Sequence, residues 1–169
     1  DQNGLVNEAF ELNYDSGIYD WSGKIDFDYY PSPAHHIRFG VQHTYHDFNP
    51  GLFQVKFSSN NQTELEQSFG NSRVYSNEFY TYVEDDFEIN NRLKINAGLH
   101  FSGFILKSDT YTSLQPRLSV RYKISDKTSI KGSYAAMAQY IHLLTNQGIG
   151  LPTDLWVPST ERIKPQTSF

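Results

Sequence analysis

The stretch that decides the fold is Leu114-Gln-Pro-Arg-Leu-Ser-Val-Arg-Tyr-Lys-Ile124. Every second residue in it is non-polar or aromatic: Leu114, Pro116, Leu118, Val120, Tyr122 and Ile124. The residues between them are all polar: Gln115, Arg117, Ser119, Arg121 and Lys123. This two-residue period over eleven residues predicts a β-strand with one apolar and one polar face. Its length is about that of a strand that crosses a membrane.

The alternation continues after a short polar turn at 125–127. One face of the next segment carries Ile130, Gly132, Tyr134, Ala136, Ala138 and Tyr140, and the other carries Ser129, Lys131, Ser133 and Gln139. Two alternating runs joined by a short polar turn predict a β-hairpin.

Two more hairpins follow the same plan, with turns at 31–36 and 90–92. The apolar face of the first carries Trp21, Gly23, Ile25, Phe27, Tyr29, Ile37, Phe39, Val41, His43 and Tyr45. That of the second carries Phe79, Thr81, Val83, Phe87, Ile89, Leu93, Ile95, Ala97, Leu99 and Phe101. Residues 4–14 alternate with the opposite parity to 19–29. They predict either a separate short strand or one long strand with a bulge near 15–17.

Directly opposed residues of a hairpin share a face, so the loop lengths predict cross-strand pairs. Ile89 is expected opposite Leu93, and Tyr29 opposite Ile37. In this register three pairs of polar residues lie directly opposite each other across a hairpin: Glu88 and Lys94, Asp86 and Asn96, and Asp28 and Arg38. The Glu88–Lys94 and Asp28–Arg38 pairs are expected to form ion pairs on the polar face.

The hairpin around 125–127 carries two features that oppose this scheme. Pairing Ile124 with Thr128 sets Arg121 opposite Lys131, a like-charge pair that needs an acid from a neighbouring strand. Pro116 removes one donor from the hydrogen-bond ladder, so we expect it at a bulge or a strand end.

Composition excludes several classes of protein. The 169 residues include 2 Trp, 12 Tyr and 12 Phe, no Cys, and a net charge of −5. The missing cysteines exclude a disulfide scaffold and a thiolate metal site, and the negative charge argues against nucleic-acid binding. No window approaches the roughly 18 apolar residues of a membrane helix. A transmembrane β-barrel remains, because only alternate residues of its strands face lipid.

The connections between strands are asymmetric. The three short turns alternate with longer connections at about 50–72, 106–112 and 143–161, as in outer-membrane barrels with short periplasmic turns and long outer loops. We expect 50–72 and 143–161 to be the outer loops, the second with Trp156. Aromatic residues near the strand ends predict an interfacial girdle or ordinary strand composition: Tyr29, Tyr30, Phe87 and Tyr122.

The six histidines do not form a metal-binding pattern. His43 and His46 are three residues apart and therefore face opposite sides of a strand, and 35–36 lies in a turn. His100 and His142 are isolated. We therefore expect solvated or interface histidines and no metal ligand.

The run Glu84-Asp85-Asp86 lies in a segment rich in carboxylates. Four acidic residues share a face: Glu78, Glu84, Asp86 and Glu88. They predict a polar channel wall or a cation site, or a solvated strand face with cross-strand Lys and Arg partners. There is no nucleophile elbow, phosphate-binding loop or dinucleotide motif. We therefore assign no catalytic, cofactor-binding or metal-ligating residue, and predict a protein without cofactors that is not an enzyme.

Several segments resemble the barrel of TonB-dependent outer-membrane receptors. They are 111–134 (YTSLQPRLSVRYKISDKTSIKGSY), 139–144 (QYIHLL), 150–158 (GLPTDLWVP) and 163–166 (IKPQ), together with 24–31 (KIDFDYYP), 37–40 (IRFG) and 45–51 (YHDFNPG). The resemblance covers most of the chain in order. The HLL and GLPTDLWVP motifs are specific to it, whereas the alternation alone is not.

The resemblance implies an active transporter of the bacterial outer membrane. Such receptors have a barrel of about 22 strands closed by a plug, and a TonB energy-transducing complex acts through a segment linked to that plug. The implied cargo is a scarce nutrient, an iron chelate, cobalamin or glycan. The implied partners are therefore the TonB complex, the lipid bilayer and the small-molecule or glycan cargo, with no nucleic acid.

The chain departs from the complete pattern of this family. We find no plug and no TonB-contacting segment, and seven or eight strands fit the sequence. The last residues, 163–168, do not alternate. We therefore expect residues 1–169 to be an all-β antiparallel meander of long hairpins, a partial segment of a large transmembrane β-barrel. The contact residues of the cargo cannot be named.

Three other classes share the alternating pattern. They are a complete small outer-membrane barrel of eight strands, a soluble lipocalin-like ligand carrier and an outer-membrane hydrolase. In a lipocalin the apolar face points inward, whereas in a receptor it meets lipid. Alternation in the sequence does not distinguish these two arrangements.

Overall fold

The chain folds into β-strands. The computed structural model describes residues 8–59, 62–70, 73–146 and 153–169. The strands are β1 (Glu8–Ser32), β2 (His35–Ser59), β3 (Gln62–Gly70), β4 (Val74–Asn90), β5 (Leu93–Leu106), β6 (Thr110–Ser125), β7 (Thr128–Ala135), β8 (Met137–Gln139), β9 (Ile141–Asn146), β10 (Thr153–Pro158) and β11 (Gln166–Ser168). The described part of the chain contains no helix with the length and hydropathy to span a bilayer.

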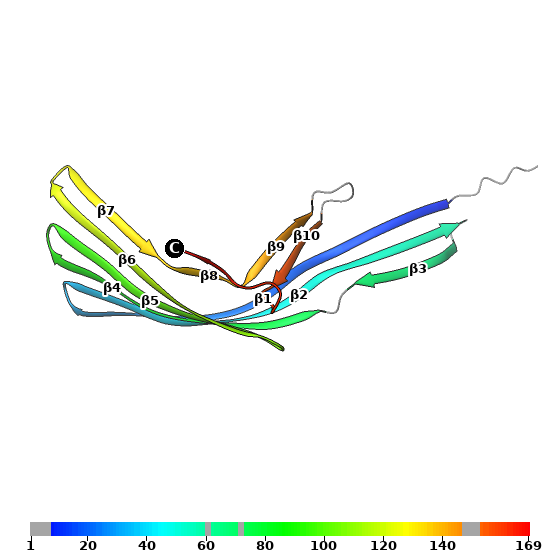
Figure 1. Cartoon of the computed structure of the whole chain (residues 1–169), viewed down its shortest axis with the longest axis horizontal. Helices are drawn as coiled ribbons and strands as arrows, with labels where there is room; N and C mark the ends of the chain where they lie inside the picture. Colours follow the sequence, from blue (N-terminus) through cyan, green and yellow to red (C-terminus); the bar gives the residue numbers. More distant parts are fainter. Residues whose placement is uncertain (1–7, 60–61, 71–72, 147–152) are drawn as a thin grey trace, which may run out of the picture. The chain divides into compact units, whose positions relative to one another are not determined.

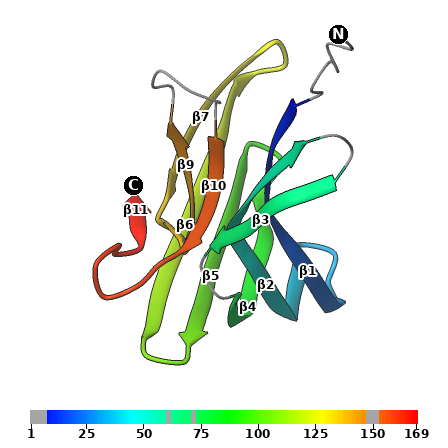
Figure 2. The ribbon, with the colours of Figure 1, turned by 90° about the vertical axis from the view of Figure 1, so that its right-hand side faces the viewer.

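The strands form one large sheet and two small ones. The large sheet has the order β1-β2-β4-β5-β6-β7, with β3 paired to β2, while β9 pairs with β10 and β8 with β11 (Figures 1 and 2). The ladders β2–β3, β4–β5, β5–β6, β6–β7 and β8–β11 are antiparallel. The predicted all-β antiparallel meander is therefore confirmed. Within the described residues no ladder joins β7 to β1, so the sheet is a partial barrel segment and not a closed eight-stranded barrel.

The chain divides into two compact units that we describe separately. The first comprises 1–19, 47–74 and 142–157, and the second comprises 20–46, 75–141 and 158–169. Strands β1 and β2 contribute residues to both.

The first unit corrects the expected loops at 50–72 and 143–161. Most of 50–72 is extended, because β2 runs to Ser59 and β3 returns along it, with Phe57 opposite Leu65. Most of the described part of 143–161 lies in β9 and β10, and Trp156 is on β10. An ion pair of 2.9 Å joins the side chains of Arg73 and Asp47.

The ambiguity over residues 4–14 is settled from residue 8 onward. Residues 8–32 form the single strand β1, so the prediction of one long strand is confirmed there and that of a separate short strand is wrong. Residues 4–7 lie outside the described part of the chain.

The three hairpin turns of the second unit are tighter than predicted. They occupy 33–34, 91–92 and 126–127. Glu88 lies opposite Lys94, Asp86 opposite Asn96 and Arg121 opposite Lys131, as predicted. The expected Ile89–Leu93 and Ile124–Thr128 pairs are wrong, because the ladders shift there and pair Asn90 with Leu93 and Ser125 with Thr128.

The side chain of Asn90 accounts for the tighter second turn. Its Oδ1 accepts hydrogen bonds from the backbone N–H groups of Arg92, at 2.9 Å, and Leu93, at 3.0 Å. This Asx-type turn closes the hairpin over two residues and leaves Ile89 at the irregular position. The connection between β5 and β6 is also shorter than the expected 106–112, since only 107–109 lie between the strands.

Pro116 explains where β7 leaves the large sheet. It pairs with Leu99 on β5 without a register shift, so the expected bulge is absent. Its carbonyl accepts a hydrogen bond of 3.0 Å from the N–H of Ala136, one residue beyond the last β6–β7 pair. Proline has no N–H, so Pro116 cannot donate a hydrogen bond to β7 at the position where the β6–β7 ladder ends. The expectation of a strand end is wrong as well, because Pro116 lies inside β6, and the predicted continuous strand through Tyr140 is also wrong.

Successive hairpins of the second unit are staggered by a constant amount (Figure 1). The N–H of Glu88 bonds the carbonyl of Ala34, and the N–H of Lys123 bonds that of Arg92, both at 2.8 Å. The turn at 33–34 is therefore level with Glu88, which lies three residues before the turn at 91–92. The turn at 91–92 is level with Lys123, which lies three residues before the turn at 126–127. Three residues span about 10 Å, and two strand spacings also span about 10 Å. A line through the turns therefore makes an angle of about 45° with the strands, close to the strand tilt of membrane barrels.

Candidate functional site

The two faces of the sheet in the second unit have the opposite exposure to that of a soluble protein. On β5, Phe101 is 44% exposed and its chain neighbour Ser102 is 1% exposed. On β6, Leu114 is 61% exposed and Gln115 is 4% exposed. Soluble proteins bury apolar side chains and leave most polar ones in water. The buried side of this sheet is therefore the polar side.

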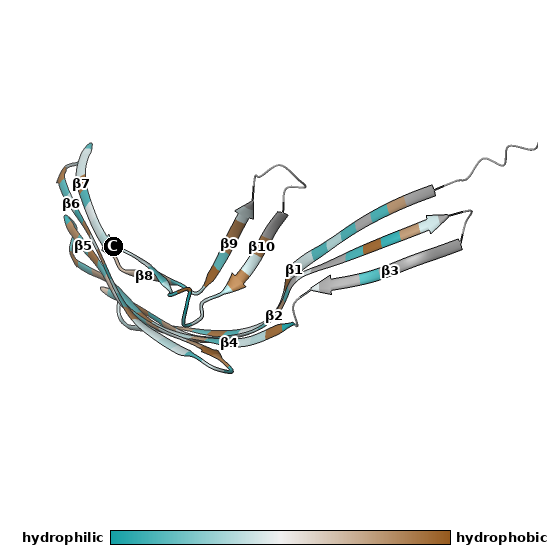
Figure 3. Ribbon diagram, turned by 45° about the vertical axis from the view of Figure 1, so that its right-hand side comes forward, coloured by the Kyte–Doolittle hydropathy of each residue, from teal (hydrophilic) through white to brown (hydrophobic). Residues whose placement is uncertain are grey.

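We call the exposed side the apolar face. It carries Trp21, Ile25, Phe27, Tyr29, Phe39, Val41, Phe79, Val83, Leu99, Phe101, Ile105, Leu114, Leu118, Tyr122, Ile124, Ile130 and Tyr134. Figure 3 shows the alternation of hydrophobic and hydrophilic residues along these strands. An exposed apolar surface of this extent marks a membrane or protein contact. A lipocalin-like carrier has its apolar face inside, so this arrangement contradicts that alternative.

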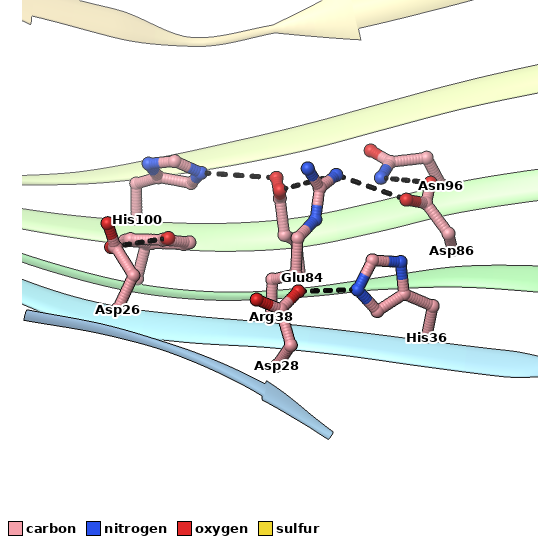
Figure 4. Close-up of polar contacts among 9 residues, drawn as sticks. Asp26, Asp28, His36, Arg38, Glu84, Asp86, Asn96 and His100 are labelled. Atoms are coloured by element: carbon pink, nitrogen blue, oxygen red, sulfur yellow. Dashed lines mark hydrogen bonds and ion pairs between the residues drawn. The ribbon is translucent and has the colours of Figure 1, made fainter. Parts of the chain in front are cut away.

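On the opposite side, which we call the polar face, Arg38 forms the central ion pairs. The guanidinium group of Arg38 lies 2.8 Å from Glu84 and 3.0 Å from Asp86, two carboxylates of the neighbouring strand β4 (Figure 4). Asn96 on β5 donates to the other oxygen of Asp86 at 2.7 Å. The Nε2 atom of His100 lies 3.9 Å from Glu84. This network joins β2, β4 and β5 on one face.

The predicted Asp28–Arg38 ion pair is replaced by other contacts. Arg38 binds the carboxylates of β4, and Asp28 instead lies 2.6 Å from the Nε2 atom of His36. The predicted Glu88–Lys94 ion pair is confirmed. The carboxylates of β4 on this face therefore have Arg, Lys, His and Asn partners, which favours the prediction of a paired strand face.

Farther from the turns, the polar face contains a cavity of about 500 Å³. Its lining residues all carry hydrogen-bonding side chains: Asp20, Ser22, Gln42, Thr44, His46, Glu78 and Tyr80. His46 is 3% exposed and lies 2.7 Å from Asp20 and 3.2 Å from Glu78. The imidazole thus fixes the two carboxylates on the wall of the cavity.

A second buried cluster shows that polypeptide covers part of the polar face. Gln115 donates to Ser102 at 2.8 Å, and the Ser102 hydroxyl lies 2.7 Å from the Tyr140 hydroxyl. The Tyr140 ring stacks on Phe104 with 5.3 Å between centroids. Ser159 then donates its N–H to the Tyr140 carbonyl at 2.7 Å. Tyr140 was expected with the apolar residues of β7, but the break at Ala136 brings it to the polar face.

The histidines serve as hydrogen-bonding and stacking residues. His43 and His46 face opposite sides, as predicted: His43 stacks on Phe79, and His46 belongs to the polar cavity. His35 lies 2.6 Å from Asp85 and stacks on Phe87. Among the residues described, no group of three or more His, Asp or Glu side chains is placed to hold a metal ion.

Aromatic residues near the turns divide between the two faces. Tyr29 and Tyr122 are exposed on the apolar face, as a girdle requires. Tyr30 stacks on His36, the partner of Asp28, and so belongs with the polar residues. The expected girdle therefore does not include Tyr30.

Reasoning from the sequence missed the contacts of Arg38 with Glu84 and Asp86, because no short turn joins β2 to β4 and fixes the register of these two strands. The Arg38 network depends on those two strands being neighbours. The extension of β2 past residue 50 was also missed, although 53–58 (FQVKFS) alternates like the other strands and could have indicated it.

Comparison with known proteins then identifies the family. A family model described as TonB dependent receptor-like, beta-barrel matches residues 2–158. The chain belongs to the TonB-dependent receptor β-barrel family. This is an outer-membrane family of transporters and not of enzymes. No curated protein and no solved structure matched the chain. For a TonB-dependent receptor barrel, the apolar face is the side that meets lipid and the polar face lines the lumen.

Proposed function

We propose that residues 1–169 form part of the wall of an active transporter that binds and imports a scarce nutrient across the bacterial outer membrane. The exposed apolar face carries this proposal, because it needs a lipid surface to cover it. The family match and the line of turns at about 45° to the strands support the same conclusion.

In this proposal the polar face is the inner wall, and the short turns at 33–34, 91–92 and 126–127 face the periplasm. The TonB complex acts on the receptor through a plug carried by another part of it. The cargo is an iron chelate, cobalamin or a glycan. The polar cavity around His46 offers hydroxyl, amide and carboxylate groups to such a molecule.

Fractionation of the native gene product tests the location. An antibody raised against residues 1–169 should detect a protein far larger than 19.5 kDa in the detergent-soluble outer-membrane fraction. A mature cellular product near 19.5 kDa, or one in the soluble fraction, would contradict the proposal.

Uptake measurements test the transport activity and identify the cargo class. Cells with and without the full-length gene would be given radiolabelled ferric chelates, cobalamin or oligosaccharides at low concentration. We expect accumulation of one class that is lost on gene deletion and on collapse of the proton-motive force. If uptake of every class is unchanged by both treatments, active transport by this protein is excluded for these cargoes.

A further inference from the structure

The cavity around His46 differs in charge from the rest of the polar face. The carboxylates of Asp20 and Glu78 line it, and no Lys or Arg of the described residues does. Both carboxylates contact the buried imidazole of His46, Asp20 at Nδ1 and Glu78 at Nε2. A histidine that donates at both ring nitrogens is an imidazolium, so the three groups together carry a charge of about −1. The cavity therefore disfavours an anionic ligand.

The lining also keeps hydrogen-bonding groups available to a ligand. One oxygen of Asp20 and one of Glu78 contact His46, and within the described chain the second oxygen of each has no hydrogen-bond partner. The Ser22 side chain is exposed and also lacks a partner there. Gln42 uses one N–H on a neighbouring hydroxyl, at 3.4 Å, and keeps its carbonyl oxygen. A ligand in this cavity thus meets two charged acceptors, a hydroxyl group and an amide.

The position of the cavity along the strands places it toward the outer end of the proposed wall. Thr44 lies ten residues after the turn at 33–34, and Glu78 lies thirteen residues before the turn at 91–92. With about 3.3 Å per residue and a tilt of about 45°, these separations correspond to about 23–30 Å along the membrane normal. The apolar band of an outer-membrane barrel is about 25 Å tall. A molecule that enters from outside the cell therefore reaches this cavity before it reaches the short turns.

We propose that the cavity binds a neutral saccharide, and hence that the cargo of the receptor is an oligosaccharide without acidic groups. Neighbouring hydroxyl groups of a sugar donate to the free oxygens of Asp20 and Glu78, and hydrogen bonds to an ionised acceptor are the strong ones. The sugar oxygens also accept from Ser22 and Gln42. A neutral ring brings no charge against the carboxylates.

Size and charge separate this ligand from the other cargo classes. A volume of about 500 Å³ is in the range of small-molecule sites, and cobalamin, which carries a corrin ring and a nucleotide, is larger than this space. Iron chelates built on carboxylates or catecholates are anions, which Asp20 and Glu78 repel. The inference rests on the proposed function, because it takes the polar face as the inner wall of a transporter, and it narrows the cargo to one class.

Binding measurements on the full-length receptor, purified from outer membranes in detergent, test the ligand class. The probes are an array of neutral and uronic-acid-containing oligosaccharides, together with ferric citrate, a ferric hydroxamate and cyanocobalamin in solution. We expect binding to one or more neutral oligosaccharides and none to the acidic members of the array.

Two substitutions then test whether the sugar lies in this cavity. D20N removes a charged acceptor and should weaken binding of the neutral oligosaccharide by about tenfold or more in isothermal titration calorimetry. S22W fills the cavity from an exposed position and should weaken binding to a similar extent without changing the melting temperature. D28N is the matched control, because Asp28 lies on the same face close to the turns, and it should bind like the wild type.

Any of four results overturns the proposal. Binding confined to acidic oligosaccharides, iron chelates or cobalamin would assign another ligand class, and absence of saccharide binding would remove the ligand. Unchanged binding in S22W would place the sugar elsewhere in the receptor, and an equal loss in D28N would trace the effect to net charge rather than to this cavity. These failures leave the receptor in the outer membrane with uptake of another cargo class, whereas failure of the proposed function appears as uptake of every class unchanged by gene deletion.

Discussion

Leu118 and Ser119 are chain neighbours that the strand directs to opposite faces. Leu118 is 46% exposed among other apolar residues, and Ser119 lies opposite Asn96 on the polar face. In water an exposed leucine costs little to replace. On the lipid side of a membrane strand, a charged replacement loses its hydration.

We therefore expect Leu118→Arg to destabilise the full-length receptor by about 2–4 kcal/mol, the range for a cation near the middle of a bilayer. Ser119→Arg should change stability by less than about 1 kcal/mol, since its side chain faces the polar lumen. Urea unfolding in lipid vesicles measures both. Equal effects of the two substitutions would show that the faces are assigned incorrectly.

Arg38 and Lys94 differ in how many carboxylates depend on them. Arg38 reaches both Glu84 and Asp86, whereas Lys94 meets Glu88 alone at an exposed site. Both cations are more than one-third exposed, so solvent screens each pair. We expect Arg38→Gln to cost about 1 kcal/mol and Lys94→Gln less than about 0.5 kcal/mol in the same unfolding assay. A larger loss of stability in Lys94→Gln than in Arg38→Gln would show that Arg38 is not the main cation of the network.

Reasoning from single residues predicted the Glu88–Lys94 and Asp86–Asn96 pairs, because a short turn fixes the register of its two strands, but it was wrong about the Asp28–Arg38 ion pair. It did not predict Arg38 with Glu84 and Asp86, since β2 and β4 are separated in the sequence by β3. Alternation assigned each residue to one of two faces. Only the exposure of Phe101 against the burial of Ser102 shows which face is outside.

At the scale of the element, the hairpin turns determine the register. Asn90 accepts two backbone hydrogen bonds and closes the 91–92 turn, whereas the neighbouring Asn91 is exposed. The two asparagines therefore form a matched pair for testing the turn.

We expect Asn90→Ala to destabilise the β4–β5 hairpin by about 1 kcal/mol, through the loss of two acceptor contacts. Asn91→Ala should remain within about 0.5 kcal/mol of the wild type. Hydrogen exchange of the Ile95 and Ala97 amides, which face β4, would show whether the loss is local when it is measured together with global unfolding. Unchanged exchange in Asn90→Ala would contradict this account of the turn.

The sequence predicted the three central hairpins because each has a regular two-residue period and a polar turn. It did not predict where β7 ends, because Tyr134, Ala136, Ala138 and Tyr140 continue the period without interruption. The reason lies on the adjacent strand, where Pro116 has no N–H to extend the ladder. Such a break depends on a partner far away in the sequence, which alternation within one segment does not contain.

At the scale of the whole molecule, the repeated three-residue stagger of the turns predicts the tilt of the strands. We expect polarised infrared spectroscopy of the full-length receptor in aligned bilayers to give a mean strand tilt of about 45° from the membrane normal. A tilt near zero would mean that the three turns do not lie in one plane parallel to the membrane.

The placement of the apolar face in lipid is the central claim, and single-cysteine labelling along β6 tests it most directly. Residues 1–169 contain no cysteine, and each introduced thiol reports alone once every cysteine elsewhere in the receptor is replaced by serine. In vesicles containing the full-length receptor, probes at 118, 120 and 122 should be quenched by lipid-borne quenchers. Thiols at 117, 119 and 121 should instead be protected from them. The reverse pattern, or equal quenching at all six positions, would contradict the account.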